Sequence, residues 1–185
     1  MKKVWYGVGL GVGLLVMLVW QSPDSQLKII ACNVGQGDAI LITKGKSQVL
    51  VDGGPSGEKV LSCLGEHVPF YDRQIELIVL TNTDYDHMNG LSAVLERYTV
   101  LEFVTADGVH SSAALNKLTD QLANKQIQVE AVEQGDQLRI LGVDELQFQV
   151  LWPPEVIEEY VAVIGHQMED SVREQILGAS AKRGD

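Results

Sequence analysis

The sequence predicts a mixed α/β fold, with sheet layers that carry helices on their outside. Two observations predict it. From Gln26 the chain holds short apolar runs separated by glycine-containing turns, which is typical of antiparallel strands. After residue 56, strand-like runs alternate with segments of helical spacing. A chain of 185 residues, 45% hydrophobic and 21% charged, has room for one domain of ordinary size.

The opening of the domain is predicted to be antiparallel. Three apolar runs, at 27–34, 38–44 and 47–54, are separated by turns too short for any crossover helix. A helix is expected at 57–68, where apolar residues recur at helical spacing. The run IELIVL at 75–80 is apolar at every position but Glu76, which is typical of a strand covered on both faces.

The later elements follow in alternation. We expect a helix that begins near Asn89, a strand at 100–106, and a helix at 111–125 with Ser111 or Ser112 as its N-cap. Three further strands are expected at 127–132, 136–141 and 146–153, the last ended by Pro153 and Pro154. Beyond this point the apolar pattern degrades.

The first residues form a separate unit. Val4–Trp20 is apolar or glycine at all 17 positions and follows Lys2 and Lys3, which predicts an uncleaved membrane anchor over 1–22 and a folded domain over 26–185. The alternatives are a cleaved signal peptide, which would make the domain a secreted one, and a buried core helix. The anchor places the domain outside the cytoplasm, on a single-pass protein of the cell membrane.

Charge limits the class of partner. The net charge is −11, and from position 21 onward 12 basic residues face 25 acidic ones. An acidic surface repels phosphate backbones, so broad nucleic-acid binding is disfavoured unless a metal supplies positive charge. The two cysteines, Cys32 and Cys63, lie in apolar surroundings, and we expect buried free thiols there rather than a disulfide.

Polar clusters stand at three predicted strand ends. They are NVGQGDA at 33–39, VDGG at 51–54 and TNTDYDH at 81–87. Each alone is explained by an ordinary turn, and GQG lacks the third glycine of a dinucleotide fingerprint. The last cluster places Asp84, Asp86 and an imidazole within four positions. Carboxylates this close repel one another unless a cation lies between them, which indicates a divalent metal.

The three clusters in this order resemble the metallo-β-lactamase-fold domain of the ComEC type, found in DNA-uptake proteins and stand-alone relatives. The resemblance covers about 28–154. It implies an αββα sandwich with a metal site at the strand ends. It also implies a hydrolase in which zinc or manganese activates a water that attacks a phosphodiester, with nucleic acid as the expected substrate class.

The resemblance carries over residue by residue. Asp84, Asp86 and His87 fall on metal-ligand or water-activating positions, with Asp84 and Asp86 the candidate catalytic carboxylates. Asp38 and Asp52 fall on supporting positions of neighbouring motifs. One departure concerns the first ligand position, where Asn82 replaces the histidine of the family. An amide oxygen is a poor zinc ligand and suits a harder ion such as magnesium or manganese.

A second departure concerns the C-terminal part. The family continues with an N-x-x-S segment, a strand ending in T-G-D and an H-H-G-S turn, whereas here only 170–172 resembles the serine segment. The resemblance therefore implies an incomplete C-terminus, with His67, His110 and His166 as possible substitute ligands. Two hypotheses remain open: a membrane-anchored hydrolase, and a catalytically silent member of the fold that acts as a binding module.

Overall fold

Two β-sheets and a layer of helices form the domain. The computed structural model describes Gly11 and residues 25–105, 112–140 and 146–153. The larger sheet has six strands in chain order: β1 (Lys28–Ala31), β2 (Ile40–Lys44), β3 (Ser47–Val51), β4 (Gln74–Leu80), β5 (Thr99–Thr105) and β6 (Gln128–Ala131). The smaller sheet pairs β7 (Gln137–Ile140) with β8 (Leu146–Gln149). The helices are α2 (Gly57–His67), α3 (Tyr85–Met88), α4 (Leu91–Arg97) and α5 (Ala113–Asn124).

The larger sheet changes direction at β3. Strands β1, β2 and β3 are antiparallel, whereas β3 to β6 are parallel. This confirms the predicted antiparallel opening and the mixed α/β class. The loops that follow β1, β3, β4 and β5 therefore meet at one edge of the sheet, which is where the polar clusters of the sequence lie.

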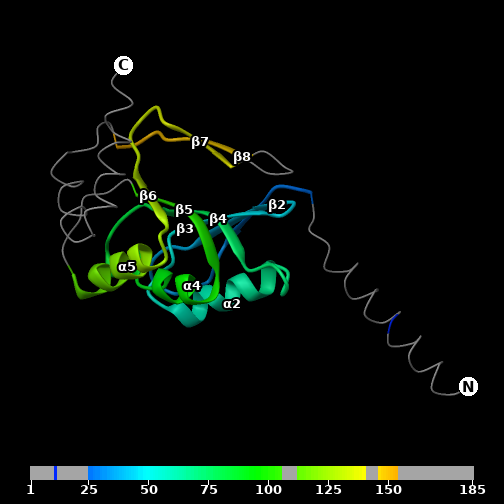
Figure 1. The fold of residues 1–185 in the computed structure, drawn as a ribbon. Helices are drawn as coiled ribbons and strands as arrows, with labels where there is room; N and C mark the ends of the chain where they lie inside the picture. Colours follow the sequence, from blue (N-terminus) through cyan, green and yellow to red (C-terminus); the bar gives the residue numbers. More distant parts are fainter. Residues whose placement is uncertain (1–10, 12–24, 106–111, 141–145, 154–185) are drawn as a thin grey trace, which may run out of the picture.

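Helices and the smaller sheet cover opposite faces of the larger sheet (Figure 1). On the helical side, α2, α4 and α5 bury apolar side chains against the sheet, among them Val60, Leu64, Leu91, Leu95 and Leu118. On the other side, a second core joins the sheet to β7 and β8 through Val49, Leu77, Val104, Ile140 and Leu146. Strand β4 contributes to both cores, as its largely apolar run predicts.

The helix boundaries agree with the sequence at one cap and at one helix start. Ser112 caps α5, its Oγ accepting from Leu115 N at 3.1 Å, while Ser111 lies outside the described residues. The helix expected to begin near Asn89 is α4, which begins at Leu91, and a short helix that was not predicted, α3, precedes it. The break falls at Gly90, whose N–H donates to the carbonyl of Gly54 at 2.8 Å rather than to an oxygen of its own helix.

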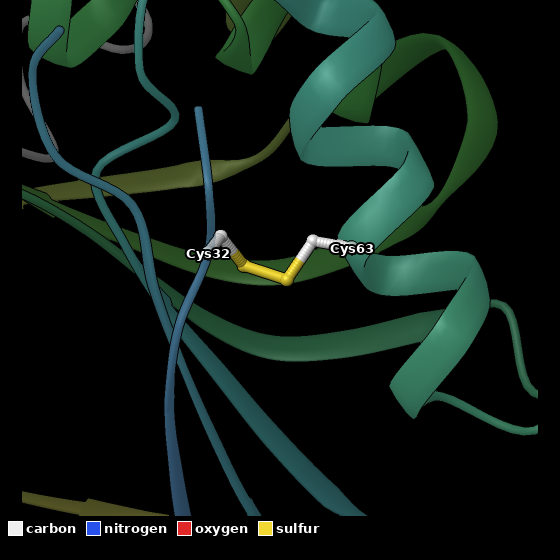
Figure 2. Close-up of a disulfide and its surroundings, with 2 residues drawn as sticks. All are labelled: Cys32 and Cys63. Carbon is white, nitrogen blue, oxygen red and sulfur yellow. A yellow bond between two sulfur atoms is a disulfide. The ribbon is translucent and has the colours of Figure 1, made fainter. Parts of the chain in front are cut away.

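The two cysteines form a disulfide, so the prediction of free thiols is wrong (Figure 2). Cys32 directly follows β1, and Cys63 lies on the side of α2 that faces it, with a Cα–Cα distance of 5.7 Å. That separation is within the range a disulfide bridges. The apolar sequence around each cysteine predicted burial, but both are only partly buried. The cross-link ties the start of the 33–39 loop to the helical layer.

Several predicted features lie outside the residues that the structure describes. The anchor at 1–22 lies outside the described residues apart from Gly11, and so do His110, His166 and the segment from Pro154 to Asp185. Within the part of the chain that the structure describes, no helix has both the length and the apolar character needed to cross a bilayer.

Candidate functional site

The predicted site residues gather at the edge where the parallel strands end. Asp52 follows β3, and Asp84 precedes α3 directly after β4. Asp86 and His87 lie within α3, and Asp38 precedes β2. The motif that the sequence placed on a turn is thus a single helical turn, closed by bonds from His87 N and Met88 N to the carbonyl of Asp84, each 3.0 Å.

Asp52 is the most connected of these residues. It is 2% exposed, and its φ of 58° is in the left-handed region that an aspartate tolerates better than most residues. Its N–H donates to Val79 O at 2.8 Å. Its carboxylate accepts from Thr81 N at 2.8 Å and from Thr81 Oγ1 at 2.5 Å. The same carboxylate lies 2.9 Å from His87 Nδ1. A residue held in this backbone conformation by so many bonds makes this edge the candidate site.

The bond to Asp52 decides which nitrogen of His87 is available. Nδ1 is engaged by the carboxylate, so Nε2 is the nitrogen left for a ligand. The hydrogen bond that the Asp52 carboxylate accepts raises the pKa of His87 above its ordinary value of 6.5. The charges of Asp52, Asp86 and Asp38 raise this pKa further, whereas burial lowers it. Asp86 therefore acts on the imidazole electrostatically from the same helical turn, and Asp38 from the 33–39 loop.

Backbone bonds join the three loops of the site. Gly53 N donates to His87 O at 2.7 Å, and Asp38 N donates to Asp86 O at 3.3 Å. Gly37, with a φ of +88°, lies so close to the carbonyl of Asp86 that a Cβ at this position would overlap it. Gly37 of the GQG motif is thus required by the approach of α3, whereas a Cβ at Gly53 of the DGG motif would meet Leu91 at the start of α4.

Asn82 and Asp84 are held in a different manner. The Asn82 amide donates from Nδ2 to Asp84 Oδ2 at 3.0 Å, and its Oδ1 accepts from Asp84 N at 2.8 Å. Both polar ends of the amide are therefore used within a local turn. Asp84 is exposed and is the N-cap of α3 without a capping bond from its side chain.

The donor set fits a divalent cation only in part. His87 has the carboxylate partner that metal-binding histidines usually have, and Asp86 lies beside it in the same helical turn. Among the described residues, however, no three His, Cys, Asp or Glu side chains come together as a metal-binding group. His67 ends α2, at the opposite end of the sheet from the site.

Two features of the site were missed in the sequence. Thr81 anchors Asp52 with two bonds, and a cavity of about 340 Å³ borders it. The cavity lies between the ends of β3 and β4 and the 148–153 segment, with a largely apolar lining that includes Phe148 and Trp152. A threonine immediately after a buried strand is common in turns, so the sequence held no distinctive signal for it.

A comparison with protein-family models identifies the superfamily of the chain. A family model described as the Metallo-beta-lactamase superfamily matches residues 32–161. The chain is similar to ComE operon protein 3 of Bacillus subtilis, with 24% identity over 163 residues that cover 76% of this chain and 20% of that protein. It is also similar to Recombination protein 2 of Haemophilus influenzae, with 30% identity over 93 residues that cover 49% of this chain and 12% of that protein. The chain thus spans a small part of the length of either relative.

Two solved structures are similar at low identity. Rm3 metallo-beta-lactamase superposes with a TM-score of 0.45 and 18% identity, covering 65% of this chain and 48% of that one. MEM-A1, a subclass B3 metallo-beta-lactamase isolated from a soil metagenome library, has a TM-score of 0.41 and 17% identity, covering 64% and 47%.

Proposed function

Because the chain belongs to the metallo-beta-lactamase superfamily and has ComEC-type relatives, we propose that its domain is a metal-dependent hydrolase of phosphodiesters, with nucleic acid as the substrate class. One observation carries the proposal: Asp52 Oδ2 lies 2.9 Å from His87 Nδ1. A buried carboxylate on one nitrogen of an imidazole fixes the ring for a ligand on the other nitrogen.

The residues of the site have different roles in this proposal. His87, Asp86 and Asp84 would hold the cation, and Asp52 is a positioning residue that fixes the His87 ring. A bound divalent cation supplies a water of lowered pKa and polarises the scissile phosphodiester. The negative field of Asp38, Asp52 and Asp86, which raises the pKa of His87, attracts a cation and repels a phosphate. Substrate binding at this edge therefore depends on the cation.

Asn82 sets the expected metal preference. Its amide is bonded at both ends to Asp84, so the first ligand position of the family offers no imidazole. The remaining donors are one imidazole and carboxylate oxygens, a set that suits manganese or magnesium better than zinc. We expect weak metal binding with an oxygen-ligand preference, and slow turnover.

A second candidate function is a catalytically silent binding module of the same fold. The observation that favours it is the same local turn. With Asn82 and Asp84 bonded to each other and no three metal-binding residues grouped in the described part of the chain, the site can hold its shape without a cation. The two candidates differ in whether the chain turns over a phosphodiester.

Calorimetric titration with zinc and manganese, beside a chromogenic phosphodiester assay, separates the two candidates. For the hydrolase we expect manganese-dependent turnover that is lost in Asp86→Ala and His87→Ala, and stronger zinc binding in Asn82→His. Asn33→Ala, a change in an exposed loop residue outside the proposed ligand set, is the matched control. Metal binding without turnover, in both the parent chain and Asn82→His, would leave the silent module as the function.

We further propose that the domain lies outside the cytoplasm, anchored by the apolar segment Val4–Trp20. The Cys32–Cys63 disulfide supports this location, because disulfides persist in oxidising compartments and are rare in the cytosol. Protease added to intact cells, with any outer envelope permeabilised, should digest the domain. A domain that resists this treatment but is digested after lysis would place it inside.

A further inference from the structure

The end of the larger sheet opposite the candidate site carries exposed apolar and aromatic side chains. In the register of the sheet, Lys28 pairs with Thr43 and Lys44 with Ser47, so the start of β1 and the β2–β3 turn share one end. The start of β4, and with it the α2–β4 loop, lies at the same end because β4 is parallel to β3. In Figure 1 this end is on the right, with the blue start of the described chain and the turn after α2.

Three of the large apolar residues at this end are strongly exposed. Leu27 is 55% exposed, Phe70 54% and Tyr71 45%. The rings of Phe70 and Tyr71 pack edge to face at 5.5 Å between centroids, so they form one compact feature on the α2–β4 loop. Exposed aromatic rings of this kind are enriched where proteins meet the headgroup region of a membrane.

Basic side chains surround the same residues. Lys28, Lys46 and Arg73 are exposed here, in a chain whose net charge is −11. Arg73 is held in place by Tyr98, with its guanidinium 5.4 Å from the ring centroid and 3.3 Å from the hydroxyl. These positive charges would complement an anionic lipid surface.

The acidic residues at this end are mostly committed to protein donors. Asp72 accepts from Gln48 Nε2 at 3.1 Å and from Gln74 N at 3.2 Å. Glu76 accepts from Gln48 N at 2.6 Å. Glu66, in the last turn of α2, is exposed, so the three basic residues are balanced by three acidic ones. The end is therefore an aromatic surface of balanced charge on a molecule whose net charge is −11.

The predicted anchor joins the domain at this end. Six residues lie between Trp20 and Leu27, so their Cα atoms are seven steps apart, a span of at most about 24 Å when fully extended. Strand β4, seven residues long, sets the candidate site about 20 Å further away along the sheet. The tether therefore keeps the end with Phe70 and Tyr71 within reach of the bilayer, and the site edge is at the other end of the sheet.

We propose that this end of the domain, defined by Leu27, Lys28, Lys46, Phe70, Tyr71 and Arg73, rests on the lipid headgroup region of the anchoring membrane. The candidate site then faces away from the membrane, open to a polymeric substrate. The inference rests on the anchor of the proposed function but not on hydrolysis, so loss of enzyme activity leaves it unaffected.

The experiment uses the full chain in vesicles of phosphatidylcholine with or without phosphatidylglycerol. A fluorescent amino acid replaces Tyr71, and in a matched control it replaces Tyr85, which is 62% exposed at the site edge. Lipids with a nitroxide on the headgroup quench the label at short range. We expect quenching several-fold stronger at position 71 than at 85, and stronger with phosphatidylglycerol present.

A second variant of the chain carries the label at position 70 instead, so that a folding defect caused by the label at position 71 can be recognised. Weak, equal quenching at both ends of a vesicle-bound chain would overturn the inference, because the domain would then stand clear of the bilayer. A chain that does not bind vesicles would overturn the anchor as well. Shielding of position 71 only when another protein is added would assign this surface to a protein partner instead.

Discussion

The candidate site has two halves that the protein holds in different ways. In the deep half, Asp52 and His87 bond across 35 residues of sequence, and Asp52 is 2% exposed. In the surface half, Asn82 and Asp84 bond to each other two residues apart. The sheet therefore supports the imidazole of His87, whereas the first ligand position, Asn82, is supported only by its own turn. We therefore expect the free energy of unfolding to depend on the deep half and the metal preference to depend on the surface half.

Removal of the disulfide should have the largest effect on the free energy of unfolding. The disulfide holds the start of the 33–39 loop, which borders the deep half. The cross-link joins residues 31 positions apart, and release of a loop of that size from the unfolded chain destabilises by about 3.5 kcal/mol. We expect this loss in Cys32→Ala/Cys63→Ala, measured by urea unfolding. The parent chain under reductant should show the same midpoint, and a loss below about 1 kcal/mol would contradict the loop-closure account.

The pair Asp52→Ala and Asp84→Ala tests the comparison directly. Asp52→Ala removes the acceptor of three bonds from a buried position and leaves Thr81 and His87 without their partner, so we expect a loss of about 3 kcal/mol. Asp84→Ala should cost about 0.5 kcal/mol or less, since Asp84 is exposed and bonded locally. Equal losses in urea unfolding would mean that both halves carry the fold.

Gly37→Ala tests the approach of the GQG loop to α3. A Cβ there meets the backbone of Asp86, and the φ of +88° is unfavourable for alanine, so we expect about 2 kcal/mol of destabilisation. Gly135→Ala is the matched control, because its φ is +101° but nothing lies within 4 Å. The control should cost about 1 kcal/mol from the backbone alone. A control loss as large as that of Gly37→Ala would remove the argument for close contact.

Substitution of Glu102 should have the smallest effect on stability. Burial, and then the charge of Glu130, raise the pKa of Glu102 from its ordinary value of 4.5. A raised folded pKa means that the contribution to stability is full below about 4.5 and is lost as pH rises through the folded value. Glu102→Gln should therefore be more stable than the parent at pH 7 and equal to it at pH 4. Thermal unfolding across this range measures the difference, and a constant offset would contradict the assignment.

The sequence predicted what depends on local pattern. Apolar runs and a serine cap determine the strands and α5, and the ordered motifs gave the superfamily, which the family model confirms. The site positions read from the motifs do lie at one edge, because parallel strand ends must meet there. Their roles as ligands stay a prediction.

What could not be predicted depends on tertiary contact. The role of Asp52 depends on a positive φ and on a histidine 35 positions away. The VDGG motif indicated only a turn. The disulfide requires that β1 and α2 bring Cys32 and Cys63 together, which no spacing encodes. The four-residue helix α3 is too short to leave a periodic signal, and its C-terminal end is set by Gly54 from another loop.

The strand order β1-β2-β3-β4-β5-β6 has a consequence for how the domain is made. Each strand pairs with the one before it, so the sheet can grow by addition at a single edge as the chain is synthesised, with no later strand inserted between earlier ones. Both residues of the Asp52–His87 pair are present in the chain once residue 88 has been synthesised, before β5 or β6. The partners of the imidazole thus come early in chain order, and the later strands add to the sheet beyond them.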